Sequence, residues 1–183
     1  GPYVRNNYLF HYVISGCGTL QATDENGADH TYHIRSNQGF LIVPGQITTY
    51  TADKEHPWEY TWIEFDGMHA KEALMLSGLS INNPVYRSSE KIYSAKLKES
   101  MLCIAHHPTE MPFNLLSHLY MFIDCLMRSS ASKTTPSSSG MSTYYLEWAF
   151  SYIAQNFQNN ITIAGIAESR KIHQNYLCKI FRE

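Results

Sequence analysis

The chain has 183 residues, of which 44% are hydrophobic, 13% aromatic and 16% charged, and its formal net charge is −2. This apolar content is enough to offset the loss of chain entropy on folding, which excludes a disordered or low-complexity chain. No apolar run approaches the length of about 18 residues that indicates a transmembrane helix. The weak net charge also argues against a chain that binds nucleic acid over its whole surface.

The first 67 residues are typical of short β-strands. Apolar and β-branched runs lie between clusters of Gly, Pro, Asn and Asp, at residues 8–15, 19–23, 31–35, 40–43, 47–51 and 60–65. Strands at this spacing predict a small antiparallel β-barrel or jelly roll. A barrel of this size has room inside for one small ligand.

From residue 68 onward the apolar residues recur with the helical period of about 3.6. Helices are expected at residues 70–77, 89–105, 113–127, 144–156 and 163–169, and from residue 174 onward. The fold class is therefore α+β, with the strands first and the helices after them. The 113–127 segment carries an apolar stripe broader than one packing partner needs, so a second contact surface is expected there. The alternative is that this helix is buried entirely within its own chain.

Ser and Thr are concentrated in residues 129–143, where Pro136 and Gly140 discourage regular structure, as in a linker. The two short helices that follow match the spacing of a helix-turn-helix. Residues 161–183 hold four basic and two acidic side chains, whereas residues 1–160 hold ten and fourteen. A weakly basic end on an acidic body favours contact with DNA phosphates.

Two parts of the sequence resemble the AraC/XylS-type transcription regulators. Residues 40–46 (FLIVPGQ), Tyr50 and residues 57–67 (PWEYTWIEFDG) are similar to the effector-binding barrel of that family. Residues 161–167 (ITIAGIA) and 176–181 (YLCKIF) are similar to its first helix-turn-helix. The resemblance implies a cupin-like sensor joined to a DNA-binding module, and a homodimer paired through helices that follow the barrel.

This resemblance gives an expected organisation. Residues 1–88 form the cupin-like effector-binding barrel, 89–132 a helical dimerisation segment, 133–143 a Ser/Thr-rich linker, and 144–183 an incomplete DNA-binding module with its first helix-turn-helix. The implied function is a cytoplasmic, ligand-responsive regulator that binds promoter DNA and senses a small polar metabolite, most simply a sugar. The alternatives are a cupin-type sugar-modifying enzyme with an unrelated helical tail, and a dimerising scaffold that binds nothing.

The strand at 60–65 carries the first ligand candidates. Alternate side chains of a barrel strand point inward, so the inward set is either Tyr60, Trp62 and Glu64 or the residues between them. The named set offers aromatic faces for sugar C–H groups and a carboxylate for hydroxyl groups. The resemblance favours that set. The alternative for Glu64 is an ion pair with a nearby cation.

Alternation on two other strands adds four candidates. His11 and Ser15 share a face of the first strand, and Thr48 and Tyr50 share one after the Pro-Gly turn. The alternative for His11 is a neutral, hydrogen-bonded core histidine. The family often carries a His where Thr48 stands, which departs from its better-known sugar-binding members.

No catalytic residue, metal site or cofactor is predicted. His30 and His33 are three apart on a strand, so they point to opposite faces and cannot share a metal, and Thr48 offers no imidazole. The sequence lacks the common phosphate-loop, zinc-protease and nucleophile-elbow motifs. Its four Cys show no CxxC spacing, which favours reduced thiols.

The last helix carries the DNA-binding candidates Gln174, Asn175, Cys178 and Lys179 on its expected outward face. The resemblance implies that this helix enters the major groove with the last three of them nearest the bases. Asn pairs with adenine through two hydrogen bonds, and Lys reaches guanine or phosphate. The alternative is that all four are only solvent-facing polar residues.

Overall fold

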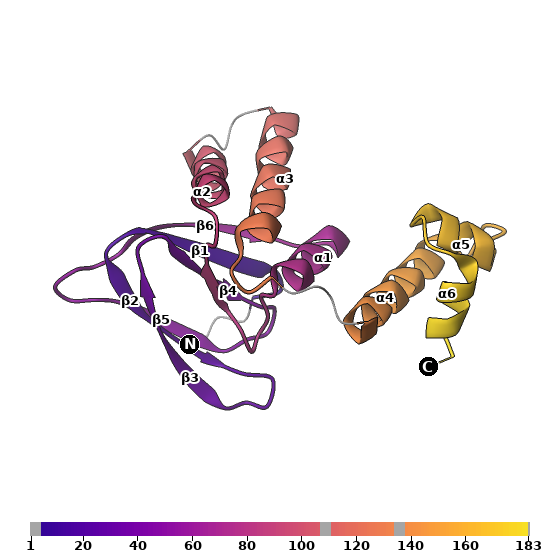
Figure 1. The fold of residues 1–183 in the computed structure, drawn as a ribbon, viewed down its shortest axis with the longest axis horizontal. Helices are drawn as coiled ribbons and strands as arrows, with labels where there is room; N and C mark the ends of the chain where they lie inside the picture. Colours follow the sequence, from indigo (N-terminus) through magenta and orange to yellow (C-terminus); the bar gives the residue numbers. More distant parts are fainter. Residues whose placement is uncertain (1–4, 107–110, 134–137, 183) are drawn as a thin grey trace. The chain divides into compact units, whose positions relative to one another are not determined.

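The computed structural model describes residues 5–106, 111–133 and 138–182 of the chain (Figure 1). The chain divides into two compact units, residues 1–134 and residues 135–183. The first unit holds the strands and three helices, in the order β1 Tyr8–Ser15, β2 Cys17–Thr23, β3 Asp29–Arg35, β4 Gln38–Ile42, β5 Thr48–Ala52, β6 Glu59–Phe65, α1 Met68–Ser77, β7 Val85–Arg87, α2 Lys91–His106 and α3 Pro112–Ser129.

The strands form two antiparallel sheets, with strand orders β6-β1-β4-β7 and β3-β2-β5. The α+β class with antiparallel strands is confirmed; of the two predicted arrangements, the barrel is not closed, because the strands form two separate sheets. Strand β6 pairs with β1 and strand β5 pairs with β2, so each lies at an edge of its sheet. Side chains rather than backbones meet between these edges, as Tyr50 and Tyr60 show with ring centroids 6.5 Å apart. Strand β7, which was not predicted, completes the first sheet.

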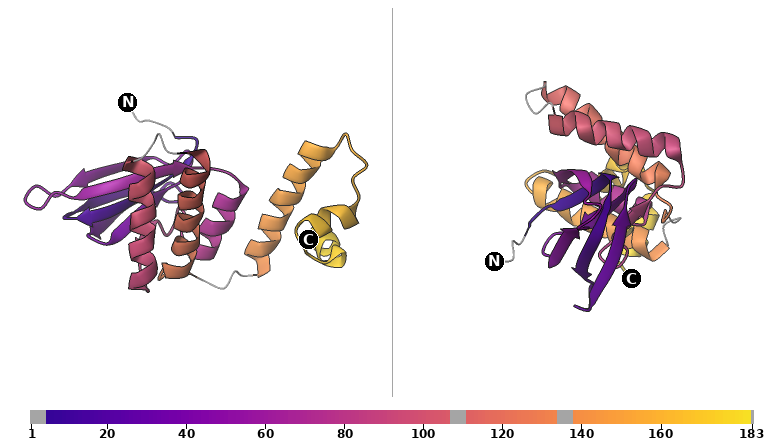
Figure 2. Two further views of the ribbon diagram at one scale, coloured as in Figure 1. Left: turned by 90° about the horizontal axis from the view of Figure 1, so that it is seen from above. Right: turned by 90° about the vertical axis from the view of Figure 1, so that its left-hand side faces the viewer.

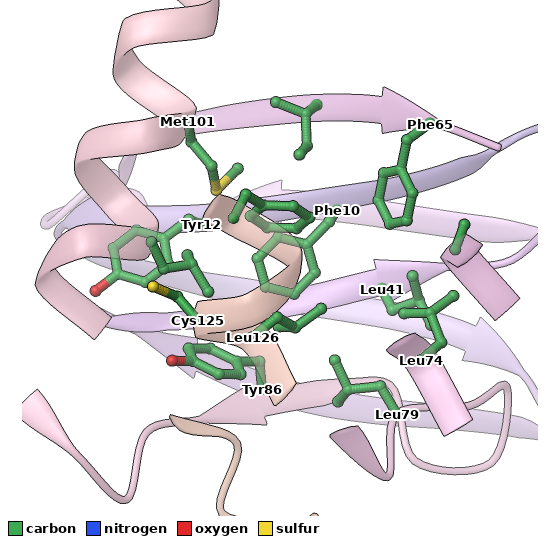
Figure 3. Close-up of a cluster of buried hydrophobic side chains, with 14 residues drawn as sticks. Phe10, Tyr12, Leu41, Phe65, Leu74, Leu79, Tyr86, Met101, Cys125 and Leu126 are labelled. Carbon is green, nitrogen blue, oxygen red and sulfur yellow. The ribbon is translucent and has the colours of Figure 1, made fainter. Parts of the chain in front are cut away.

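Helices α1, α2 and α3 cover one face of the four-stranded sheet (Figures 1 and 2). Strand β1 is buried over most of its length because helices cover one face and the second sheet covers the other. The core under the helices combines sheet and helix side chains, among them Phe10, Leu41, Ile63, Tyr86, Leu97, Met101, Phe122 and Leu126 (Figure 3). A second core lies between the sheets, around Leu9, Val13, Leu20, Ile34, Phe40 and Val85.

Helix α3 keeps part of its broad apolar stripe exposed within this unit. Phe122 and Leu126 are buried against the sheet. Phe113, Leu116 and Tyr120 remain 82%, 45% and 57% exposed. Their spacing of three and four residues places them on one side of the helix, which leaves an uncovered apolar surface.

The second unit contains α4 Ser138–Asn156, α5 Ile163–Ser169 and α6 Gln174–Ile180. The expected linker 133–143 differs from the structure in its second part, because α4 begins at Ser138. Ser and Thr cost a helix only a few tenths of a kcal/mol each relative to better formers, so a Ser-rich segment can supply a first turn. Residues 134–137 lie outside the described residues.

The two short helices of this unit begin with side-chain caps. The Thr162 hydroxyl accepts a hydrogen bond from the Gly165 N–H at 3.1 Å. Before α6, the Nδ1 atom of His173 accepts from the Asn175 N–H at 3.2 Å. Leu177 is buried in the unit.

Candidate functional site

Strand β6 separates the ligand candidates from the core as its alternation predicts. Thr61 and Ile63 are buried under the helices. Tyr60, Trp62 and Glu64 point to the opposite face, and Tyr60 and Trp62 are 39% and 51% exposed. Because β6 lies at the edge of its sheet, these side chains are accessible from outside.

Five rings, from four strands and the residue before β6, meet between the two sheets. We call them the intersheet aromatic cluster: His11, Phe40, Tyr50, Trp58 and Tyr60. The His11 ring stacks on Phe40 with centroids 4.4 Å apart and planes 13° apart. Tyr50 and Tyr60 approach His11 at 4.8 and 5.3 Å. The structure thus brings three of the predicted ligand residues together.

His11 is the buried polar centre of this cluster, with only 2% of its surface exposed. Burial, together with the nearby positive charge of Arg5, lowers the pKa of His11 to about 3. The imidazole is therefore neutral at physiological pH. Its Nδ1 atom is buried and has no hydrogen-bond partner among the residues that the structure describes. The alternative of a fully hydrogen-bonded core histidine does not fit this atom, because buried polar atoms in proteins are nearly always hydrogen-bonded.

Trp58 belongs to the cluster but was not among the predicted site residues. Its ring lies 6.2 Å from Tyr60 and 6.0 Å from Phe40, measured between centroids. The ring passes so close to Gly18 on β2 that a Cβ atom there would lie 2.5 Å from it. Trp58 precedes β6 and lies outside the predicted strands, so strand alternation gives no signal for it. The only sequence signal for Trp58 is the run Pro57-Trp58, which belongs to the segment that resembles the family.

Glu64 matches the ion-pair alternative. Its carboxylate accepts hydrogen bonds from Arg5 at 3.3 Å and from the Asn7 side-chain amide at 3.3 Å. Trp62 is paired with His11 in the β1–β6 ladder and lies beside the cluster on the same face. Trp62 is therefore the more accessible neighbour of the cluster, whereas Glu64 already has partners.

Ser15 and Thr48 lie outside the cluster. A register shift between Val13 and Ser15 interrupts the alternation of β1, and the exposed Ser15 hydroxyl donates to Glu59 at 3.4 Å. Thr48 begins strand β5, where it pairs with Ala22.

The cluster is suited to binding rather than to bond-making chemistry. Flat aromatic faces pack against the apolar C–H faces of a sugar, and a neutral imidazole exchanges a hydrogen bond with a hydroxyl group. Across residues 5–106, 111–133 and 138–182, three or more His, Cys, Asp or Glu side chains are nowhere grouped to hold a metal ion. Within the same residues, no helix has the length and apolar character needed to cross a membrane.

Helix α6 presents most of its DNA-binding candidates to solvent. Gln174, Asn175 and Lys179 are exposed. Cys178 is half-buried and borders an apolar hollow of about 350 Å³ with Ile153 and other side chains of the unit, so it is less accessible than the sequence predicts.

Comparison with known proteins gives three regulators as relatives. The chain is 28% identical to the Msm operon regulatory protein of Streptococcus mutans, 26% identical to the raffinose operon transcriptional regulatory protein RafR of Pediococcus pentosaceus, and 25% identical to the lactose operon transcription activator of Staphylococcus xylosus. Each alignment covers 100% of this chain and 64%, 65% and 66% of the respective relative. The chain thus spans about two thirds of the length of these relatives.

Solved structures resemble the chain more distantly. The AraC-like transcriptional activator CuxR is 13% identical, with a TM-score of 0.47 over 97% of this chain and 61% of that one. An oxalate decarboxylase variant from Bacillus subtilis is 14% identical, with a TM-score of 0.33 over 58% of this chain and 24% of that one. Residues 1–105 match the family described as the AraC-like ligand binding domain. This match covers more than half of the chain, which therefore belongs to the AraC-like ligand-binding domain family.

Proposed function

We propose that this chain is the sensor and the first helix-turn-helix of a cytoplasmic transcription regulator that responds to a sugar. The intersheet aromatic cluster carries the proposal, because it combines accessible aromatic faces with the buried, unpartnered Nδ1 atom of His11. Tyr60 and Trp62 stack on the sugar at the edge of β6, and Tyr50 closes the other side. Two of the three relatives are named for sugar operons, which supports the same ligand class.

The other parts of the chain take the roles that such a regulator needs. Helix α3 pairs two copies through its exposed apolar surface, around Phe113, Leu116 and Tyr120. Helix α6 contacts promoter DNA through Gln174, Asn175 and Lys179, with the bases in the major groove. Catalysis has no part in this function, and no metal or other cofactor is required by the cluster.

The test is a thermal-shift panel of mono-, di- and trisaccharides. A sugar at 100 times its dissociation constant stabilises the folded state by about 2.7 kcal/mol, which is a measurable rise in melting temperature. We expect one saccharide class to give a saturable shift that depends on Tyr60. A panel without any saturable shift would contradict the sugar assignment. A sugar that is chemically converted during incubation, detected by NMR, would favour the enzyme alternative.

A further inference from the structure

A second cavity in the first unit shares no residue with the intersheet aromatic cluster. It lies where the turn between β3 and β4, the end of β7 and the first turns of α2 come together, and its volume is about 500 Å³. Small-molecule sites occupy about 300–1,000 Å³, so a ligand of the size of a monosaccharide derivative fits this space.

Three basic side chains line this cavity: Arg87, Lys91 and Lys98. No Asp or Glu is among its lining residues. In the described parts of the chain, none of the three cations forms an ion pair with a carboxylate. Residues 1–160 carry ten Lys and Arg and fourteen Asp and Glu, so their net charge is negative. The cavity is therefore locally positive within an acidic part of the chain. An anion would relieve the mutual repulsion of the three cations.

The backbone fixes where these cations are placed. Lys91 and Lys98 are seven residues apart, which puts them on one face of α2, two turns from each other. Arg87 ends β7, opposite Gln38 of β4 in the antiparallel ladder. Helix α2 has 16 residues and starts at Lys91, so the partial positive charge of its N-terminus adds to the three cations.

Buried hydroxyl groups form the inner part of the cavity. Tyr12 and Ser94 are 1% and 6% exposed, and their hydroxyl oxygens lie 3.1 Å apart. Figure 3 shows Tyr12 at the end of the core cluster with its oxygen directed away from Phe10. The Tyr12 hydroxyl donates to Asn37 Oδ1 at 3.5 Å, and the Asn37 N–H donates to the Val13 carbonyl at 2.8 Å. The cavity thus joins a cationic rim to polar groups that suit a hydroxylated ligand.

We propose that this cavity binds a small phosphorylated metabolite of the size of a hexose phosphate. Arg87, Lys91 and Lys98 bind the phosphate, because a phosphate dianion matches three cations better than a single carboxylate charge does. Tyr12, Ser94 and Asn37 face the hydroxylated part. The protein then has two sites on one unit, the intersheet cluster for a neutral sugar and this basic cavity for an anionic one. This inference does not depend on the sugar site, because the two share no side chain.

Isothermal titration calorimetry at constant ionic strength tests this proposal with three probes: glucose 6-phosphate, inorganic phosphate and glucose. We expect saturable binding of glucose 6-phosphate, at least tenfold weaker binding of inorganic phosphate, and no competition by glucose. Lys98→Gln should weaken glucose 6-phosphate binding at least tenfold. Lys96→Gln is the matched control, because Lys96 is exposed on the same helix and does not line the cavity, and it should change the affinity less than twofold.

Several results would overturn the proposal. The first is the absence of saturable glucose 6-phosphate binding. The second is an equal loss of glucose 6-phosphate affinity in Lys98→Gln and Lys96→Gln. The third is inorganic phosphate that binds as tightly as the sugar phosphate. A duplex DNA whose binding is lost in Lys98→Gln, with no binding of the sugar phosphate, would assign the patch to nucleic acid instead. If Lys98→Gln fails to fold by circular dichroism, the exposed Lys91→Gln replaces it. Tyr60→Ala should leave glucose 6-phosphate binding unchanged, which separates this site from the sugar site.

Discussion

His11 illustrates how a single buried residue links the candidate site to the stability of the fold. The surrounding rings and the nearby Arg5 charge disfavour the imidazolium form, which lowers the pKa of His11 to about 3. In the unfolded chain, the His11 side chain has the ordinary histidine pKa of about 6.5. The free energy of unfolding therefore depends on pH, and His11 contributes to this dependence.

The first prediction is that His11 makes the protein less stable as the pH falls. Between pH 6.5 and about 3, the unfolded state takes up a proton at His11 and the folded state does not. The His11 contribution lowers the free energy of unfolding by about 1.4 kcal/mol per pH unit, or about 2 kcal/mol at pH 5. Urea unfolding at pH 7 and pH 5 should show a smaller loss in His11→Gln than in the wild type. Equal losses in the two proteins would contradict a neutral, buried imidazole.

The second prediction concerns the two accessible rings of β6. Tyr60→Ala and Trp62→Ala should each weaken sugar binding about tenfold, because each loses a stacking contact of about 1.4 kcal/mol. Glu64→Gln should have a smaller effect, since its carboxylate is held by Arg5 and Asn7. Calorimetric titration with the saccharide found in the thermal-shift panel measures all three. Thr49→Ala is the control, because Thr49 is exposed on the outward face of β5. An unchanged affinity in both ring variants would remove β6 from the ligand site.

At the scale of whole elements, the sequence predicts most strands, but it does not show whether their sheets close into a barrel. The alternation of β6 is visible in its residues because one face is buried and the other is not. Strand β7 was missed because three residues are too few for a periodic pattern, and its pairing with β4 depends on contacts distant in the sequence. Trp58 was missed for a related reason: alternation describes strands, and Trp58 enters the cluster from outside one.

Helix α3 gives the third prediction, that the protein is a homodimer in solution. Its side chains at Phe113, Leu116 and Tyr120 form an exposed apolar surface that a second copy can cover. Leu116→Lys should give a folded monomer, because it places a charge on that surface without disturbing the buried face. Analytical ultracentrifugation with circular dichroism measures both properties. Thr49→Lys, a charge on an exposed strand position, should remain dimeric. A wild type that stays monomeric at tens of micromolar would contradict the dimer.

Helix α6 gives the fourth prediction, which concerns a protein that carries a whole DNA-binding module. Asn175→Ala should relax the base preference at one operator position, at a cost of about 1–3 kcal/mol. Lys179→Gln should weaken binding to all sequences and reduce the slope of log K against log salt by about one. Fluorescence anisotropy with matched and altered duplexes at several salt concentrations distinguishes the two effects. Identical behaviour of the two variants would exclude a base contact by Asn175.

At the scale of the whole molecule, the division into two compact units predicts two unfolding events. Each unit has its own buried side chains, such as Phe122 in the first and Leu177 in the second. Calorimetry should resolve two transitions, because two-state behaviour holds for single domains and not for joined ones. A sugar that binds the intersheet cluster should raise only the transition of the first unit, by about 2.7 kcal/mol at 100 times its dissociation constant. A single transition that shifts as a whole would show that the units unfold together.

The close approach of Gly18 to Trp58 has a consequence for how related chains can diverge. A Cβ atom at position 18 would lie 2.5 Å from the Trp58 ring and 2.5 Å from the Thr51 carbonyl oxygen, so the ring and the neighbouring strand leave no space for a side chain. Position 18 is therefore restricted to glycine by two neighbours at once, the Trp58 ring and the Thr51 backbone. Relatives that keep a tryptophan at the position of Trp58 should keep glycine at the position of Gly18, and those with a larger residue at the glycine should have lost the indole and shifted the neighbouring strand. An aligned set of relatives tests this expectation directly, since tryptophan at position 58 beside a residue larger than glycine at position 18 would contradict it.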